Sequence, residues 1–293
     1  MEEFILLIKK INKLSDEVIK EIREVELICK DHDKLNGSIF LDISINFNPE
    51  MNPLFLLYED NRLVSLISMF APTSEEAEIS AYTLPDYRRR GYFKMLLDEA
   101  IEEVKKYSIS DLVFVCETQS NDGKKVMKKL NTELDFTEYL LSYKGLSSDM
   151  DIHQISEIKL LKSQEKDLEA IISLSQEIFN DDYEDAKSMI TKSFEADNRI
   201  QYIAVLDEKP IGMGSVSFEN DEASISGFGV SPQYQGKGFG REILELILKD
   251  LKSGGRADIT IEVDSNNGNA FKLYRKCGFE IETSFDYYRK NIV

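Results

Sequence analysis

Three glycines alternate in the segment Gln235–Gly240, which reads QGKGFG and lies between a β-rich run and an amphipathic run. Glycine lets a backbone turn tightly and approach a ligand without a Cβ in the way. The start of a helix offers unpaired N–H groups and the positive end of the helix dipole. The segment therefore predicts a cradle for an anion, most naturally a pyrophosphate. Lys237 and Arg241 add positive charge to it.

Other phosphate-binding motifs fit this segment less well. A P-loop requires GxxxxGK[ST], but Ser231 stands where its first glycine should be and Gly238 where its Ser or Thr should be. A dinucleotide fingerprint requires GxGxxG, and Arg241 replaces its third glycine. A glycine-rich turn without a ligand remains the alternative interpretation.

The elements around this loop occur twice in the chain. Pro85 and Pro232 are 147 positions apart, as are Gly91 and Gly238, and this period is about half of the 293 residues. Such a repeat indicates two domains of one fold. In each copy we expect a helical region, a strand hairpin, a further strand, the loop and then an amphipathic helix. The expected helical regions are 14–29 and 166–194, and the expected strands are 54–58, 63–70, 112–116, 202–206, 211–218, 223–230 and 259–263.

Two motifs carry a resemblance to a known family. The segment Gly229–Gly240 resembles the acetyl-CoA-binding motif of the GNAT N-acetyltransferases, whose core pattern is [QR]xxGx[GA]. About 30 residues further on, Asn269–Phe279 is similar to the second hallmark of the family, NxxAxxLYxxxGF, in a loose form. The resemblance implies an α/β fold with a mixed sheet, in two tandem GNAT-like domains. We expect a degenerate domain at 1–148 and an intact one at 152–293.

The resemblance also implies the site residues, with acetyl-CoA as co-substrate. The backbone N–H of Val230 would stabilise the thioester oxygen. Tyr274 would act as general acid toward the CoA sulfur, unless it is an ordinary core tyrosine. Gly227 and Gly229 suit a bulged strand that a ligand approaches, or a plain strand irregularity. The implied cofactor-binding residues are Phe228, Gly229, Val230, Gln235, Gly236, Lys237, Gly238, Phe239, Gly240, Arg241 and Asn269.

The general base cannot be read from the sequence. Many members of the family place a carboxylate on the fourth strand, where this chain has Ser224 by the repeat register. Glu219 and Glu222 lie just before it and are candidates for action through water.

The first half departs from the family pattern. Its loop, Arg88–Phe93, keeps an arginine and a glycine but ends in Phe93, whose ring would crowd a phosphate. The repeat register sets Lys124 opposite Asn269 and Lys129 opposite Tyr274, so the first half is expected to lack the acid. The three arginines of this loop either bind phosphate or form a solvated turn.

Composition limits the partners and the compartment. The net charge of −18 disfavours nucleic acid and favours a cationic amine acceptor, either a small molecule or a peptide. No apolar run is long enough to span a bilayer, and we expect no membrane partner. Three scattered cysteines and two histidines predict neither a disulfide framework nor a metal site. These features together predict a cytoplasmic protein.

The resemblance implies an N-acetyltransferase that moves an acetyl group from acetyl-CoA directly to a primary amine. The active site is expected in the C-terminal domain. The alternatives are a non-catalytic acyl-CoA-binding module and an interaction module without any affinity for CoA. The sequence fixes neither the acceptor nor the oligomeric state.

Overall fold

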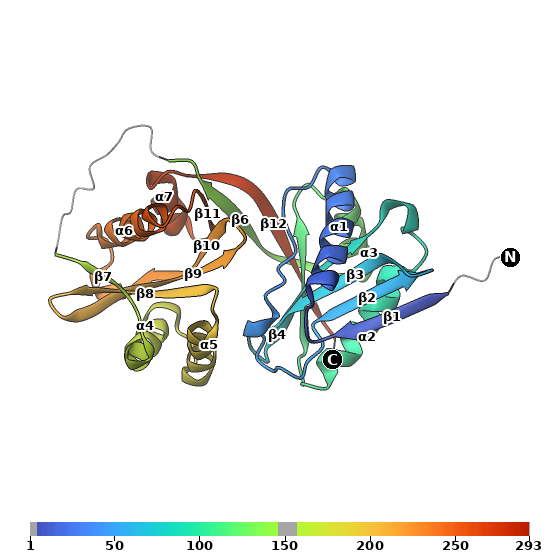
Figure 1. Cartoon of the computed structure of the whole chain (residues 1–293), viewed down its shortest axis with the longest axis horizontal. Helices are drawn as coiled ribbons and strands as arrows, with labels where there is room; N and C mark the ends of the chain where they lie inside the picture. Colours follow the sequence, from blue (N-terminus) through green and yellow to red (C-terminus); the bar gives the residue numbers. More distant parts are fainter. Residues whose placement is uncertain (1–4, 146–156, 293) are drawn as a thin grey trace. The chain divides into compact units, whose positions relative to one another are not determined.

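The computed structural model describes residues 5–145 and 157–292. The chain divides into two compact units (Figure 1). Unit 1 comprises Met1–Thr137 together with Thr283–Val293, and unit 2 comprises Glu138–Glu282.

Unit 1 is built on a sheet of order β1-β2-β3-β4-β5-β12, antiparallel except for the parallel pair β4–β5. Its strands are β1 (Leu6–Ile11), β2 (Leu54–Glu59), β3 (Arg62–Phe70), β4 (Glu76–Thr83), β5 (Asp111–Glu117) and the end of β12 (Phe279–Asn291). Its helices are α1 (Asp16–Asp33), α2 (Tyr92–Lys105) and α3 (Asn121–Leu130).

Unit 2 repeats this plan with the sheet order β6-β11-β10-β9-β8-β7, in which β10–β11 is the parallel pair. Its strands are the end of β6 (Glu133–Tyr143), β7 (Lys159–Lys162), β8 (Arg199–Leu206), β9 (Lys209–Glu219), β10 (Glu222–Val230) and β11 (Asp258–Asp264). Its helices are α4 (Leu168–Phe179), α5 (Tyr183–Glu195), α6 (Phe239–Ser253) and α7 (Gly268–Lys276).

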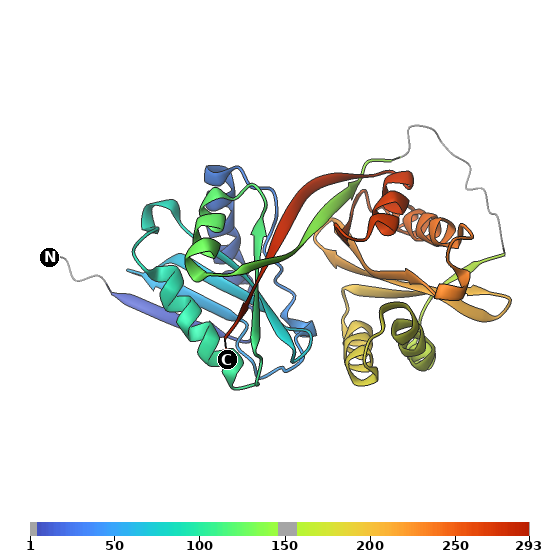
Figure 2. The same cartoon turned by 180° about the vertical axis from the view of Figure 1, so that it is seen from behind.

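The two units exchange their last strands. Strand β6 follows α3 in the first half of the chain, yet its residues 138–142 pair with β11 of unit 2. Strand β12 follows α7, yet its residues 285–291 pair with β5 of unit 1. Figures 1 and 2 show β6 in green and β12 in red as they pass from one unit to the other. The expected domains, 1–148 and 152–293, do not include this exchange, and their boundary lies outside the described residues.

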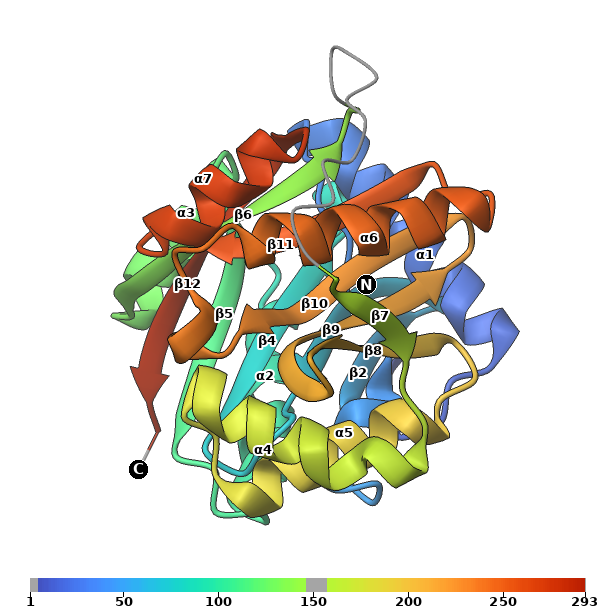
Figure 3. The same cartoon turned by 90° about the vertical axis from the view of Figure 1, so that its left-hand side faces the viewer.

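The amphipathic patterns place the helices of unit 2 on both faces of its sheet (Figure 3). Helices α6 and α7 cover one face, where Ile243, Ile247 and Tyr274 join a core with Ile225 and Ile261. Helices α4 and α5 cover the other face with a second, smaller core. Successive side chains along β10 and β11 therefore point in turn toward α6 and α7 and toward the opposite face of the sheet.

The expected helices and strands are confirmed with small differences. The region 166–194 is two helices, because Asn180 adopts the left-handed conformation (φ 62°) and Asp182 begins a new helix as its N-cap. The edge strands β1 and β7 were not among the expected strands. A helix and one further strand close each half, α3 with β6 and α7 with β12.

Candidate functional site

Strand β10 of unit 2 separates from its parallel neighbour halfway along. It pairs with β11 only over Glu222–Ile225 but continues to pair with β9 as far as Val230. A one-residue shift in the register between Ser226 and Gly229 marks a β-bulge, and Gly227 within it has φ 54°. The edge of β10 from residue 226 to 230 is consequently left open on the side that β11 would occupy.

The backbone N–H of Val230 points to this open side. The next N–H, that of Ser231, donates to the carbonyl of Ile211 in β9 (2.9 Å). Successive N–H groups of a strand point in opposite directions, so that of Val230 faces away from β9. Gln235 Nε2 donates to the carbonyl of Val230 on the same side (2.8 Å). An oxygen placed at this edge would meet a backbone donor.

The glycine loop leaves a row of donors at the start of α6. Gly236 (φ 74°) and Gly238 (φ 90°) adopt conformations that favour glycine, and Gly238 is the N-cap without a side-chain hydrogen bond. Within the described chain, the N–H groups of five consecutive residues, 236–240, have no hydrogen-bond partner. Together with the helix dipole they form a site suited to an anion.

The two cations expected to assist the loop have protein contacts already. Lys237 Nζ donates to the carbonyl of Gln233 (2.9 Å), and Arg241 Nε pairs with Glu245 Oε1 (2.7 Å). The backbone therefore supplies the donors that remain available to a ligand.

Tyr274 of α7 lies beside the open edge of β10. Its ring meets that of Phe228 with centroids 6.2 Å apart, and it is buried. Burial raises the pKa of Tyr274 to about 12, so the hydroxyl stays protonated at neutral pH. No described residue forms a hydrogen bond with this hydroxyl. Asn269 lies exposed in the first turn of the same helix, after the N-cap Asn267.

A residue that the sequence reasoning missed lies on β11. Glu262 follows Ile261, the last residue paired with β10, so it stands where the two strands part. Its neighbours Ile261 and Val263 face α6 and α7, and Glu262 therefore points to the opposite face. Desolvation by the surrounding protein raises the pKa of Glu262 to about 7, and the charges of Glu138 and Glu222 add to this. The residue remains open to solvent.

The carboxylates suggested from the sequence lie farther from the opening. Glu222 begins β10, eight residues and about 25 Å of strand before Val230, and accepts a hydrogen bond from Thr260 (2.8 Å). Glu219 ends β9 at the same end of the sheet. Alternation along 259–263 was the signal that could have indicated Glu262, because it is the one charged residue in that run.

Unit 1 keeps part of this arrangement. Strand β4 pairs with β5 only over Glu76–Ile79, and Gly91 (φ 89°) is the N-cap of α2 as Gly238 is of α6. The β4 register, however, runs without a bulge, and Tyr82 stands at the position of Gly229. In unit 2 a Cβ at Gly229 would lie 2.4 Å from Ile178, so packing of α4 also requires that glycine.

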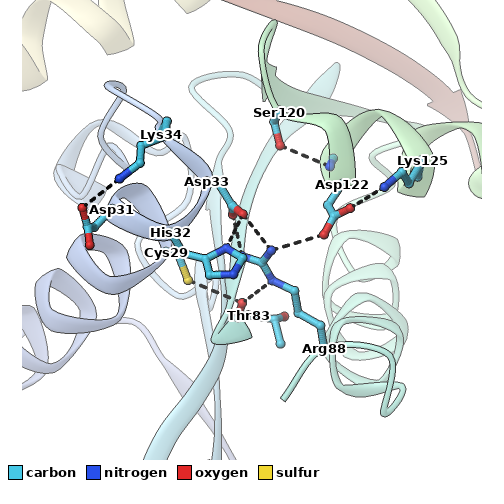
Figure 4. Close-up of polar contacts among 11 residues, drawn as sticks. Cys29, Asp31, His32, Asp33, Lys34, Thr83, Arg88, Ser120, Asp122 and Lys125 are labelled. Carbon is cyan, nitrogen blue, oxygen red and sulfur yellow. Dashed lines mark hydrogen bonds and ion pairs between the residues drawn. The ribbon is translucent and has the colours of Figure 1, made fainter. Parts of the chain in front are cut away.

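In unit 1, carboxylates from two helices bind Arg88 of the loop (Figure 4). Arg88 corresponds to Gln235, and its Nε donates to the carbonyl of Thr83 (3.0 Å). Its two terminal nitrogens hold Asp33 of α1 at 2.9 and 2.5 Å, and one also contacts Asp122 of α3 (3.3 Å). The thiol of Cys29 donates to the same carbonyl of Thr83. Arg88 is therefore bound within the protein, and is neither a free phosphate ligand nor part of a solvated turn.

Arg90 is engaged as well, with Glu59 (3.2 Å) and the carbonyl of Asp86 (3.0 Å). Two of the three arginines in the loop are thus held by intramolecular contacts. Arg88 is half-buried and bound on both sides, whereas Arg90 keeps an exposed side chain.

The helix caps correct the repeat register expected for α3. Ser120 caps α3 and Asn267 caps α7, 147 positions apart. Asp122 therefore corresponds to Asn269, and Met127 corresponds to Tyr274. The expected partners Lys124 and Lys129 were wrong by two residues, because Gly123 and Gly268 stand at different positions in the first turns of the two helices. Met127 is buried in the core, so unit 1 has no hydroxyl at this position.

Within residues 5–145 and 157–292, no cluster of histidine, cysteine or acidic residues is suited to hold a metal ion. The same part of the chain contains no helix long and apolar enough to cross a membrane. All three cysteines are free and buried.

Comparisons with known proteins agree with this geometry. Residues 18–128 and 167–279 each match the family model described as "Acetyltransferase (GNAT) family". The ribosomal protein bS18-alanine N-acetyltransferase of Escherichia coli (strain K12) is 38% identical over 63 residues, which cover 22% of this chain and 43% of that protein. Streptothricin acetyltransferase of Escherichia coli is 36% identical over 81 residues, or 27% and 47%. The matches thus cover less than half the length of these relatives.

Solved structures match over nearly the whole chain. A GCN5-related N-acetyltransferase from Sphaerobacter thermophilus has a TM-score of 0.76 at 15% identity, covering 98% of this chain and 95% of its own. A tandem GNAT protein from the clavulanic acid biosynthesis pathway has a TM-score of 0.70 at 14% identity, covering 99% and 98%. At these identities the likeness shows the fold, which is that of two GNAT domains in tandem.

Proposed function

Because this chain belongs to the GNAT acetyltransferase family, with two copies of the domain, we propose that unit 2 carries the active site. It transfers an acetyl group from acetyl-CoA directly to a primary amine. The observation that carries this proposal is the open edge of β10, where the Val230 N–H, the free donors of 236–240, Tyr274 and Glu262 converge. Unit 1 lacks the bulge and the hydroxyl, and its loop residue Arg88 binds Asp33 and Asp122.

Each group has one task in the proposed reaction. The free N–H groups at the start of α6 bind the pyrophosphate of acetyl-CoA. The amine nitrogen attacks the thioester carbon, and the negative charge that develops on the oxygen is stabilised by the Val230 N–H. The carbon–sulfur bond then breaks, and Tyr274 supplies a proton to the leaving sulfur, because a thiol has a pKa near 8.5.

Glu262 is the proposed general base. An amine attacks only in its neutral form, so the proton of the ammonium must be removed. A carboxylate with a pKa near 7 is a stronger base than an ordinary glutamate, and about half of it is still ionised in neutral solution. Glu262 lies on the face opposite to α7, whereas Tyr274 lies on the α7 side. The proton is therefore removed from the amine on one face of the sheet and supplied to the leaving thiolate on the other.

The acceptor is proposed to be cationic, either a small molecule or a peptide amine. Glu138, Glu222 and Glu262 lie on the acceptor face of the sheet, in a chain of net charge −18. Such a field raises the local concentration of a cation. A cytoplasmic location fits three free, buried cysteines.

Calorimetric titration with acetyl-CoA, followed by a thiol-release assay with a panel of mono- and polyamines, tests the proposal. We expect one site per chain and turnover with cationic amines. Binding without release of CoA from any amine would favour an acyl-CoA-binding module instead. Absence of binding would overturn the proposal and leave an interaction module.

A further inference from the structure

The strand exchange brings a charged residue of the first half of the chain into unit 2. Strand β6 follows α3, but its residue Glu138 stands directly opposite Asp264 of β11, and Leu140 stands opposite Glu262. Tyr139 and Leu141 pack against the core under α6 and α7. Glu138 therefore points to the other face, the same face as Glu262, as its diagonal neighbour across the strand pair.

Diagonal neighbours of an antiparallel pair are about 7–8 Å apart, within reach of long side chains. Two like charges at such a distance each disfavour the ionised form of the other. Among the described residues, the charges that act on Glu262 are both carboxylates, Glu138 on β6 and Glu222 on β10. Asp264 lies two residues further along β11, and its carboxylate accepts a hydrogen bond from the N–H of Asn266 (2.7 Å).

We propose that Glu138 is a positioning residue of the transferase site in unit 2: its negative charge makes Glu262 a stronger base. This inference rests on the proposed function. The first half of the chain, whose loop arginine is bound to Asp33 and Asp122, thus contributes to catalysis through one strand. Desolvation by the surrounding protein remains the larger cause of the raised pKa of Glu262, and Glu138 is the first of the two charges that add to it.

The pH dependence of kcat/KM tests this role. In Glu138→Gln, the acidic limb of the profile should move to lower pH by roughly half a unit, as expected for one like charge removed at this distance. The plateau above pH 8 should fall about twofold, because the base is weaker. The matched control is Glu133→Gln, which removes the same charge from the exposed start of the same strand, within unit 1. It should leave the limb in place.

A titration without substrate separates the two proposals. In protein with 13C-labelled glutamate carboxyls, the Glu262 signal is assigned by its loss in Glu262→Gln and followed against pH. A midpoint that falls in Glu138→Gln, but not in Glu133→Gln, supports the coupling even if no amine is acetylated, in which case the proposed function fails alone. An unchanged midpoint in Glu138→Gln, or a lower plateau without a shifted limb, overturns the role of Glu138.

Discussion

Arg88 grips Asp33 through two terminal nitrogens, at 2.9 and 2.5 Å, at the position where unit 2 has the neutral Gln235. Both loop residues make the same bond to the last carbonyl of the preceding strand, to Thr83 in one unit and to Val230 in the other. The copies therefore share a backbone frame and differ in what fills it. In unit 1 the loop arginine binds protein carboxylates, whereas in unit 2 the loop N–H groups of 236–240 have no partner among the described residues.

This ion pair should stabilise unit 1 without serving catalysis. Burial alone would raise the pKa of Asp33, but hydrogen bonds from Arg88 and His32 bring it below the ordinary value. Stability from a carboxyl of lowered pKa is present above its unfolded pKa, near 4, and is lost as the pH falls further. We expect Asp33→Asn to cost about 1–3 kcal/mol at pH 7 and less at pH 3. Thermal unfolding at both pH values measures this.

The control for that prediction is Asp31→Asn, two residues earlier on the same helix. Asp31 pairs with Lys34 in an exposed contact (3.3 Å), which contributes almost nothing to stability. Acetyl transfer should be unchanged in both variants. A loss of activity in Asp33→Asn would contradict the assignment of the active site to unit 2.

The two helix-capping glycines offer a test of which cleft binds CoA. Gly238 (φ 90°) and Gly91 (φ 89°) have almost the same conformation, so an alanine strains each by about 1–2 kcal/mol. We expect Gly238→Ala to weaken acetyl-CoA binding at least tenfold, because the strain displaces the free N–H groups. Gly91→Ala should bind acetyl-CoA normally. Equal weakening in calorimetry would mean that both clefts bind the ligand.

Removal of the Tyr274 hydroxyl should separate catalysis from binding. In Tyr274→Phe, kcat should fall about 10²- to 10³-fold, as for loss of a general acid, while the affinity for acetyl-CoA is kept. The stability should change by less than about 1 kcal/mol, since no described residue bonds this hydroxyl. Tyr202→Phe is the matched control, because its hydroxyl donates to Asp250 (2.6 Å) in the same unit. It should lower stability but preserve kcat.

Glu262→Gln should lower the activity and raise the stability of the protein. A carboxyl whose folded pKa is raised to about 7 destabilises the folded state as the pH rises from the unfolded pKa through 7. The variant should therefore have a higher Tm than the wild type at pH 8 and a similar one at pH 4, and it should lose most of its turnover. Glu219→Gln, at the far end of the sheet, should retain both properties. A fully active Glu262→Gln would exclude this residue as the base.

The strand exchange predicts that neither half of the chain is complete. Fragments 1–145 and 157–293 each carry a last strand that pairs in the other unit. Mixed after separate expression, they should form a stable one-to-one complex with acetyltransferase activity, whereas fragment 157–293 alone should aggregate or remain unfolded. Analytical ultracentrifugation and the thiol-release assay test this. Two monomeric, folded halves would show that each strand can return to its own sheet.

The sequence was informative where a local motif sets the backbone. Gly236 and Gly238 predicted the loop, and the 147-residue period predicted the repeated fold. The sequence did not predict contacts between residues that are distant in the chain. Nothing near Glu138 indicates pairing with β11, because alternation along a strand specifies a face and not a neighbour. Glu262 was missed for the same reason, since its raised pKa depends on strands that tertiary structure brings together.

Exchange of β6 and β12 also bears on how such a tandem gene can change. Deletion of the first half would remove β6, which pairs with β11 in the sheet of unit 2. It would also leave β12 at the C-terminal end without its partner β5. Each half of the chain is therefore required to complete the sheet of the other, whatever its own loop binds.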